Sequence, residues 1–150
     1  MIDTLLQHAT AVAIEGEAVL LRGAPGSGKS DLALRLIDDG AQLIADDQTI
    51  LRRVGSRVVA SAPPAIVGLI EIRGVGILRV DSTEAAPLLL IADLVASGEV
   101  ERLPEGRCET VLGVEVPVIT LAPFEASAPA KLRFLRRALA VDPLHAIIGR

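Results

Sequence analysis

The residues of this sequence with the clearest chemistry form one glycine-rich segment suited to binding phosphate. Its members are Gly23, Ala24, Pro25, Gly26, Ser27, Gly28, Lys29 and Ser30, a full match to G-x-x-x-x-G-K-[ST]. The glycines let successive backbone N–H groups point at one anion, and a following helix adds its positive N-terminal end. Lys29 supplies a charge for the terminal phosphates, and Ser30 offers a hydroxyl to Mg²⁺. The segment predicts binding of a nucleoside triphosphate with magnesium.

Two consecutive acids, Asp46 and Asp47, follow an apolar stretch that we expect to be a strand. Ligands of open α/β sheets lie outside the carboxyl ends of strands. Acids there can help hold magnesium or accept a proton from an attacking hydroxyl. Because neighbouring side chains on a strand point to opposite faces, both acids can face the site only if the backbone turns there. The alternative is an ordinary solvated turn, which Asp favours.

A third segment of interest is Glu71–Gly76, which reads Glu-Ile-Arg-Gly-Val-Gly. If it is extended, Glu71 and Arg73 lie on the same face and could bind metal and phosphate respectively. The glycines permit a tight turn or close backbone approach. Taken alone, the segment is more simply interpreted as an exposed strand end with a cross-strand ion pair.

The elements that position these residues are mostly short strands. Helical spacing is found after the glycine-rich loop, where Gly40 ends the helix, and near the C-terminal end, where Ser127 could act as a cap. We expect helices at 31–39 and about 129–140, hairpins at 11–14/18–22 and 49–54/57–60, a loop at 102–107, and further β-structure at 41–45, 66–72, 77–80, 88–95 and 110–121. The sequence therefore predicts one α/β domain over 1–150, strand-rich with few helices, unlike the regular alternation of a doubly wound fold.

Composition narrows the classes of ligand and location. Hydrophobic residues make up 51% of the 150, yet no apolar run approaches the ~18 residues of a membrane span, so we expect buried strands and no membrane. A net charge of −4 argues against nucleic acid. With a single cysteine and no basic region before the first apolar stretch, the expected location is cytoplasmic.

Aromatic residues are nearly missing, since the chain has no Trp or Tyr and only Phe124 and Phe134. The core must therefore be almost entirely aliphatic. Stacking of bases on aromatic side chains is nearly unavailable. We expect aliphatic side chains and backbone to hold the base of a bound nucleotide.

The three segments together resemble a known family, the catalytic domain of HPr kinase/phosphorylase, which phosphorylates a serine of the phosphocarrier protein HPr. The resemblance runs from His8 to about Leu121. It rests on Gly-Ala-Pro-Gly-Ser-Gly-Lys-Ser, Leu-Ile-Ala-Asp-Asp and Glu-Ile-Arg-Gly-Val-Gly-Ile, in that order. It implies a P-loop nucleotide-binding fold of the HPr kinase/phosphoenolpyruvate carboxykinase type, which fits the excess of strands.

The resemblance also implies roles for individual residues. Asp46 resembles the family's catalytic acid, which takes the proton of the substrate serine, and Asp47 its neighbour in the same site. Glu71 resembles the metal-associated acid of the family. His8 stands where the family has an active-site histidine, and Arg102 resembles an arginine in a mobile loop near the phosphates. The implied cofactors are ATP and Mg²⁺, with Ser30, Asp47 and Glu71 at the metal.

The sequence departs from the family at both ends. Members usually carry an additional N-terminal domain, whereas this chain begins almost at the catalytic domain and resembles the short form of some proteobacteria. The family has a Pro-Gly-Arg-Asn-like segment near its C-terminal end. This sequence lacks that segment and has Ala122-Pro123-Phe124-Glu125 near the same place. The family's last part helps bind HPr and build a hexamer, so this departure bears on both properties. The resemblance to the family as a whole implies a homo-oligomer.

The activity implied is an ATP- and magnesium-dependent protein serine kinase acting on HPr or an HPr-like carrier, with dephosphorylation as a possible reverse reaction. Two other functions are compatible with the loop. A small-molecule kinase would need a closed pocket, and no lid-like insertion is evident. A nucleotide-responsive regulatory module without turnover would not need the acids Asp46 and Asp47.

Overall fold

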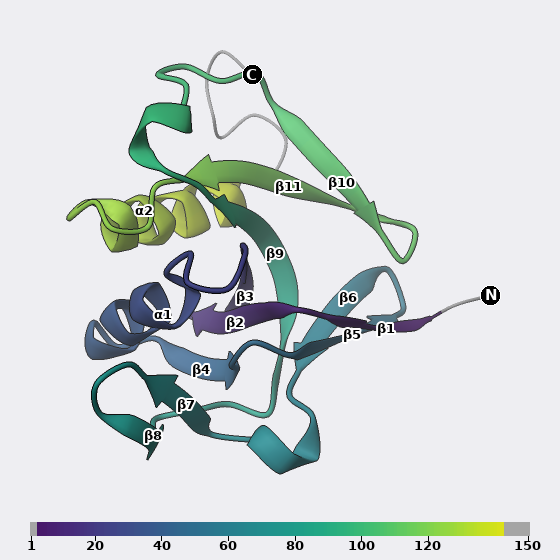
Figure 1. The fold of residues 1–150 in the computed structure, drawn as a ribbon. Coiled ribbons are helices and arrows are strands. Elements are labelled where there is room, and N and C mark those ends of the chain that lie inside the picture. The colour runs from purple at the N-terminus through teal and green to yellow at the C-terminus, as the bar shows by residue number, and fades with distance from the viewer. Residues whose placement is uncertain (1–2, 143–150) are drawn as a thin grey trace.

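The computed structural model describes residues 3–142, which form a large curved sheet, a small two-stranded sheet and two α-helices (Figure 1). Short 3₁₀ turns lie at Pro64–Ile66 and Ser97–Glu99. The strands are β1 (Thr4–Gln7), β2 (Ala9–Ile14), β3 (Glu17–Arg22), β4 (Gln42–Ala45), β5 (Thr49–Val54), β6 (Arg57–Ser61), β7 (Leu69–Ile72), β8 (Gly76–Arg79), β9 (Ala85–Leu94), β10 (Arg107–Val111) and β11 (Val114–Leu121), and the helices are α1 (Lys29–Asp38) and α2 (Ala128–Val141).

The order of the strands gathers several carboxyl ends at one edge of the sheet. The large sheet runs β1-β5-β6-β9-β3-β2-β4, and β11 pairs with β9 and β10. Strand β3 is parallel to β9, which is parallel to β11. Strand β4 also runs in the direction of β3, because both are antiparallel to β2. The chain therefore leaves β3, β4, β9 and β11 at the same edge, which is where α/β sheets bind ligands.

Strand β9 is the long element that joins the two halves of the sheet, and Figure 1 shows its curved course. Its first residues, Ala85–Pro87, pair antiparallel with β6. Its later residues pair in parallel with β3 and β11. The β1-β5-β6 strands thus extend the sheet from the first residues of β9, whereas β3, which leads into the glycine-rich loop, pairs with its later residues.

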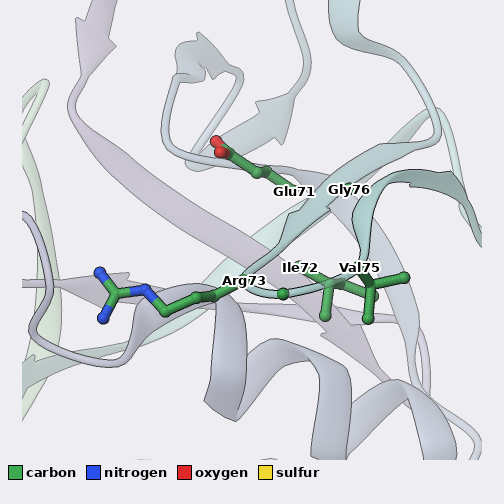
Figure 2. Close-up of a pocket in the computed structure, with 6 residues that line it drawn as sticks. Glu71, Ile72, Arg73, Val75 and Gly76 are labelled. Carbon is green, nitrogen blue, oxygen red and sulfur yellow. The ribbon is translucent and has the colours of Figure 1, made fainter.

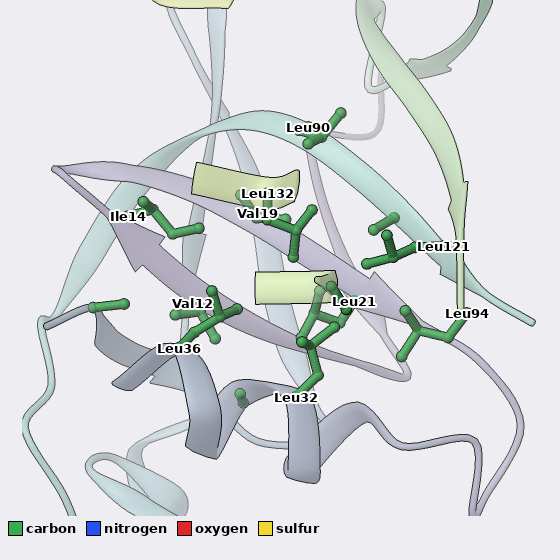
Figure 3. Close-up of a cluster of buried hydrophobic side chains, with 14 of the residues drawn as sticks. Val12, Ile14, Val19, Leu21, Leu32, Leu36, Leu90, Leu94, Leu121 and Leu132 are labelled. Carbon is green, nitrogen blue, oxygen red and sulfur yellow. The ribbon is translucent and has the colours of Figure 1, made fainter. Parts of the chain in front are cut away.

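The core lies on both faces of the central strands and is aliphatic, as expected. One cluster packs α1 and α2 against β2, β3 and β9, with Leu32, Leu132 and Leu21 among its members (Figure 3). The other cluster is rich in alanine and lies on the opposite face, with the fully buried Leu20 and Ile91 among its members. Because both faces are covered, β2 is buried along its whole length and reads as a continuous apolar run.

Most of the elements expected from the sequence are present. Both hairpins form with the expected pairing, and α1 ends before Gly40, whose φ of 105° lies in the left-handed region. No helix among residues 3–142 is long and apolar enough to span a membrane. The part of the chain after residue 142, whose structure the sequence left open, lies outside the described residues.

The structure differs from the expected elements in three places. Strand β1 is an additional strand: Thr4–Gln7 is half exposed and owes its structure to pairing with β5. The apolar stretch 66–72 is a strand only from Leu69, since the 3₁₀ turn at Pro64–Ile66 precedes it. Ser127 stands at the start of α2, but its side chain makes no capping hydrogen bond there.

Truncating Leu132 of α2 should destabilise the fold. Leu132 is fully buried between the two helices and the sheet, so Leu132→Ala is expected to cost about 2–5 kcal/mol in the free energy of unfolding. Urea denaturation followed by circular dichroism measures it. The control is Phe134→Ala on the same helix, where the side chain is 71% exposed and the expected change is within about 0.5 kcal/mol. Equal losses for the two variants would contradict the packing described.

Candidate active site

The glycine-rich segment forms a tight loop between β3 and α1. The Ser27 N–H donates to the Ala24 carbonyl at 3.0 Å, which closes the turn. Gly28 has a φ of 105°, which favours glycine. A Cβ on Gly23 would lie 2.3 Å from Ser27 Oγ, so the first glycine leaves the space that the serine hydroxyl fills. The conformation therefore depends on the glycines at the places where the motif has them.

Two groups inside the loop are suited to an anion. Lys29 is buried, and its Nζ donates to the Gly23 carbonyl at 2.8 Å, so the ammonium lies within the curl of the loop. Ser27 Oγ is buried and has no hydrogen-bond partner among residues 3–142. An unpaired buried hydroxyl is costly unless a ligand satisfies it. A charged amine and an unsatisfied hydroxyl in one loop fit a phosphate group.

The Asp46 carboxylate connects the loop to two other elements. Its Oδ1 accepts hydrogen bonds from Ser30 Oγ at 2.7 Å and from Thr10 Oγ1 at 3.2 Å. Its Oδ2 accepts from the backbone N–H of Glu71 at 3.0 Å. These donors belong to α1, β2 and β7. One half-buried side chain thus joins the helix after the glycine-rich loop, the central sheet and the small sheet.

Asp47 faces the same loop because the backbone turns at this residue. Its φ is 63°, in the left-handed region, and its N–H donates to Thr10 Oγ1 at 3.0 Å. The Asp47 carboxylate lies 3.5 Å from Lys29 Nζ and is 67% exposed. The backbone turn that the sequence required is therefore present, and it leaves the Asp47 carboxylate beside Lys29 and largely open to solvent.

Thr10 is a site residue that the sequence did not single out. It is fully buried, and its hydroxyl donates to Asp46 while accepting from the Asp47 N–H. A buried hydroxyl needs such partners. The only available signal was one polar residue inside the apolar stretch Ala9–Ile14.

The Glu71–Gly76 segment forms the end of the β7–β8 hairpin, next to Asp46. Strand β7 ends at Ile72 and the turn begins at Arg73, so Glu71 and Arg73 do not share a strand face. Their charged ends lie apart in Figure 2, and neither side chain forms an ion pair within the described residues. The interpretation as an exposed strand end is therefore confirmed for Glu71, whereas the cross-strand ion pair is not formed among the described residues. The segment lines a hollow of about 480 Å³.

His8 and Arg102 lie less close to these groups. His8 is exposed and directly precedes Ala9, which pairs with Arg22 at the end of β3, so it stands at the edge where the loop begins. Arg102 is exposed in the expected loop between β9 and β10. Within residues 3–142 neither side chain makes a hydrogen bond or ion pair with the glycine-rich loop or the two acids. The structure brings together Lys29, Ser30, Asp46, Asp47 and the Glu71 backbone, and leaves His8 and Arg102 at the margin.

A cluster of ion pairs holds the other side of the loop. Arg22, the residue before Gly23, pairs with Asp93 at 2.7 Å and with Glu109 at 2.7 Å. The hydrogen bond to Asp93 is the main cause that raises the pKa of Arg22, and Glu109 adds to it. The two carboxylates together outweigh burial, which acts to lower this pKa. Asp93 lies one residue before the end of β9, beside the loop, and its carboxylate is engaged by Arg22 and Arg107. It serves here to anchor the strand.

The donors near Ser30 suit magnesium bound together with phosphates. Residues 3–142 contain no cluster of three His, Cys, Asp or Glu side chains that could form a complete metal cage. Mg²⁺ commonly uses one or two carboxylates with substrate phosphates and water instead. The Ser30 hydroxyl and the exposed Asp47 carboxylate fit that requirement. The Asp46 carboxylate is engaged by three donors, and the exposed Glu71 carboxylate is not directed to Ser30 by any contact.

Fold and site define a P-loop α/β domain in which two consecutive acids face the loop. The family model of the HPr Serine kinase C-terminal domain matches residues 1–127. The chain belongs to this family.

Curated relatives and a solved structure agree with this assignment. An HPr kinase/phosphorylase of Caldicellulosiruptor bescii is 36% identical over 78% of this chain and 42% of its own length. One of Burkholderia lata is 38% identical over 76% of this chain and 39% of its own. The HPr(Ser) kinase/phosphatase structure from Coxiella burnetii superposes with a TM-score of 0.82 at 29% identity, covering 93% of this chain and 98% of that one. The chain thus spans about two fifths of the curated relatives and nearly all of the solved chain.

Removing the Thr10 hydroxyl should weaken the fold at the acidic pair. Thr10→Val keeps the shape but leaves the Asp47 N–H without its acceptor, so we expect a loss of about 1–3 kcal/mol in the free energy of unfolding. Urea denaturation measures the loss. The same change at the exposed Thr4 is the control and should alter stability by less than about 0.5 kcal/mol. A Thr10 variant as stable as the wild type would show that this hydroxyl does not hold the two acids.

Proposed function

We propose that this chain is an ATP- and magnesium-dependent protein serine kinase that phosphorylates HPr or an HPr-like phosphocarrier protein, in the cytoplasm. The observation that carries the proposal is the convergence of Asp46 and Asp47 on Lys29 and Ser30 of the loop. A protein that only bound nucleotide would not need two acids turned toward the phosphates. The names of the relatives, HPr kinase/phosphorylase, support the choice of acceptor.

The loop residues would hold the nucleotide. Lys29 and the backbone N–H groups of Gly23–Ser30 would bind the phosphates, with the N-terminal end of α1 adding its partial positive charge. Ser30, Asp47 and Glu71 would hold Mg²⁺, which neutralises charge on the β- and γ-phosphates when bound. Glu71 would have to turn its carboxylate toward Ser30 to take part.

Asp46 would act as the general base. As the serine oxygen of the acceptor forms its bond to the γ-phosphorus and the bond to the β-phosphate oxygen breaks, Asp46 takes the hydroxyl proton and ADP leaves. The Thr10 and Glu71 hydrogen bonds hold this carboxylate in place. His8 would assist from the start of β2, and Arg102 would reach the phosphates through movement of its loop. In the reverse direction the same groups would serve dephosphorylation.

The surroundings of Asp46 favour a protein acceptor over a small molecule. The β7–β8 hairpin beside it presents apolar side chains to solvent, with Val75 67% and Ile77 69% exposed. Exposed apolar groups next to a reactive site are typical of a protein-binding surface. A small-molecule kinase would instead enclose its substrate. By analogy with the family, the active form would be a homo-oligomer.

Replacing Asp46 by Asn tests the proposed kinase. With labelled ATP, Mg²⁺ and a purified HPr-type carrier, we expect Asp46→Asn to lower the initial rate of transfer by about 10²–10⁴-fold, the usual contribution of a general base. Binding of ATP, measured by calorimetry, should remain.

The matched control is Asp47→Asn at the adjacent position. Because Asp47 is assigned to the metal, raising the Mg²⁺ concentration should restore much of its transfer rate, and should not restore that of Asp46→Asn. The opposite pattern would exchange the two roles. Bound ATP with no transfer by the wild type would favour the regulatory module without turnover.

A further inference from the structure

The two aromatic side chains of this chain are both outside its core. Phe124 is 68% exposed and Phe134 is 71% exposed. A single exposed apolar side chain needs no explanation by itself. The surroundings of the two differ, however, since Phe134 lies on α2 and Phe124 follows the carboxyl end of β11.

Phe124 lies directly against the phosphate-binding loop. A Cβ placed on Gly28 would lie 2.9 Å from the Cζ atom of the Phe124 ring and 3.1 Å from Pro123 Cγ. Gly28 is the loop residue immediately before Lys29. The ring therefore borders the backbone that would hold the phosphates, with most of its own surface free.

The backbone on both sides of Phe124 is fixed to α1. The guanidinium of Arg35 donates to the Pro123 carbonyl and, at 3.4 Å, to the Glu125 carbonyl. Arg35 lies on the helix that begins in the loop, so the helix and the Phe124 segment are held in one arrangement. The position of the ring is thus set by groups that do not cover it.

The carboxylate of Glu125 adds a second attachment. It accepts a hydrogen bond from Lys131 at 3.3 Å, which ties the segment to α2. The nearby Ser97 hydroxyl, followed by Lys131, lowers the pKa of Glu125. An exposed ring on a well-anchored segment loses little conformational entropy when a flat ligand covers it.

We propose that Phe124 is the platform on which the base of the bound nucleotide stacks. The inference rests on the proposed function, because it requires a nucleotide with its phosphates on Gly23–Ser30. Such a nucleotide has one flat, apolar-faced group, the base, to place near the loop, and Phe124 offers the matching surface there. This proposal differs from the expectation that aliphatic side chains and backbone hold the base.

The test compares ATP with inorganic tripolyphosphate, which has the phosphates and lacks the base. Titration calorimetry with Mg²⁺ measures both affinities for the wild type, Phe124→Ala and the matched control Phe134→Ala. Loss of a stacking partner should weaken ATP binding by roughly 5- to 150-fold in Phe124→Ala. Tripolyphosphate binding should stay unchanged in that variant, and both affinities should stay unchanged in Phe134→Ala.

A tryptophan in the same place provides an independent readout. The chain has no Trp, so Phe124→Trp introduces a single indole whose fluorescence reports on its own contacts. We expect this variant to retain ATP binding and its emission to change with ATP but not with tripolyphosphate.

The outcomes separate the inference from the proposed function. If ATP binds the wild type and binds Phe124→Ala equally well, or if the indole responds alike to both ligands, the inference is overturned and the kinase proposal stands. If the wild type binds no ATP, the proposed function fails and the stacking site with it. Selective loss of ATP binding in Phe124→Ala, with the indole responding to ATP alone, supports both.

Discussion

The arrangement of this site depends on the hydrogen bonds of one carboxylate, that of Asp46. Three elements that are distant in sequence donate to it through Ser30, Thr10 and the Glu71 N–H. Hydrogen bonds to a charged group typically contribute about 1.5–3 kcal/mol each, so their loss would weaken the contacts among these elements at the site. The group proposed to take the substrate proton is thus also the group that assembles its surroundings.

The sheet makes this convergence possible, and it secures the loop on two sides. Since β3, β4, β9 and β11 all end at one edge, the loop, the acidic pair, Asp93 and Phe124 lie at the same edge of the sheet. Arg22 fixes the start of the loop to β9 and β10 through Asp93 and Glu109. Asp46 fixes its end through Ser30. A loop held at both ends can present its N–H groups to an anion with little rearrangement.

The sequence was most informative where chemistry and local conformation coincide. Residues 23–30 need glycines, a lysine and a serine at set places, so the motif predicted the loop and the helix after it. It was least informative where a role depends on contacts distant in sequence. Thr10 looks like one polar residue in a strand until Asp46 is placed beside it, and Phe124 matters only because β11 ends next to Gly28. The alternation of side chains along a strand placed Glu71 and Arg73 on one face, but it could not predict that the strand ends at Ile72 and that a turn begins at Arg73.

The central claim is that this site transfers a phosphoryl group from ATP to a serine of a carrier protein. Mass-spectrometric mapping of an HPr-type carrier, after incubation with the chain, ATP and Mg²⁺, tests it most directly. We expect phosphate on one serine of the carrier, formed only when the chain, ATP and Mg²⁺ are all present. Phosphate on a different type of residue, or an unmodified carrier beside a chain that binds ATP, would contradict it.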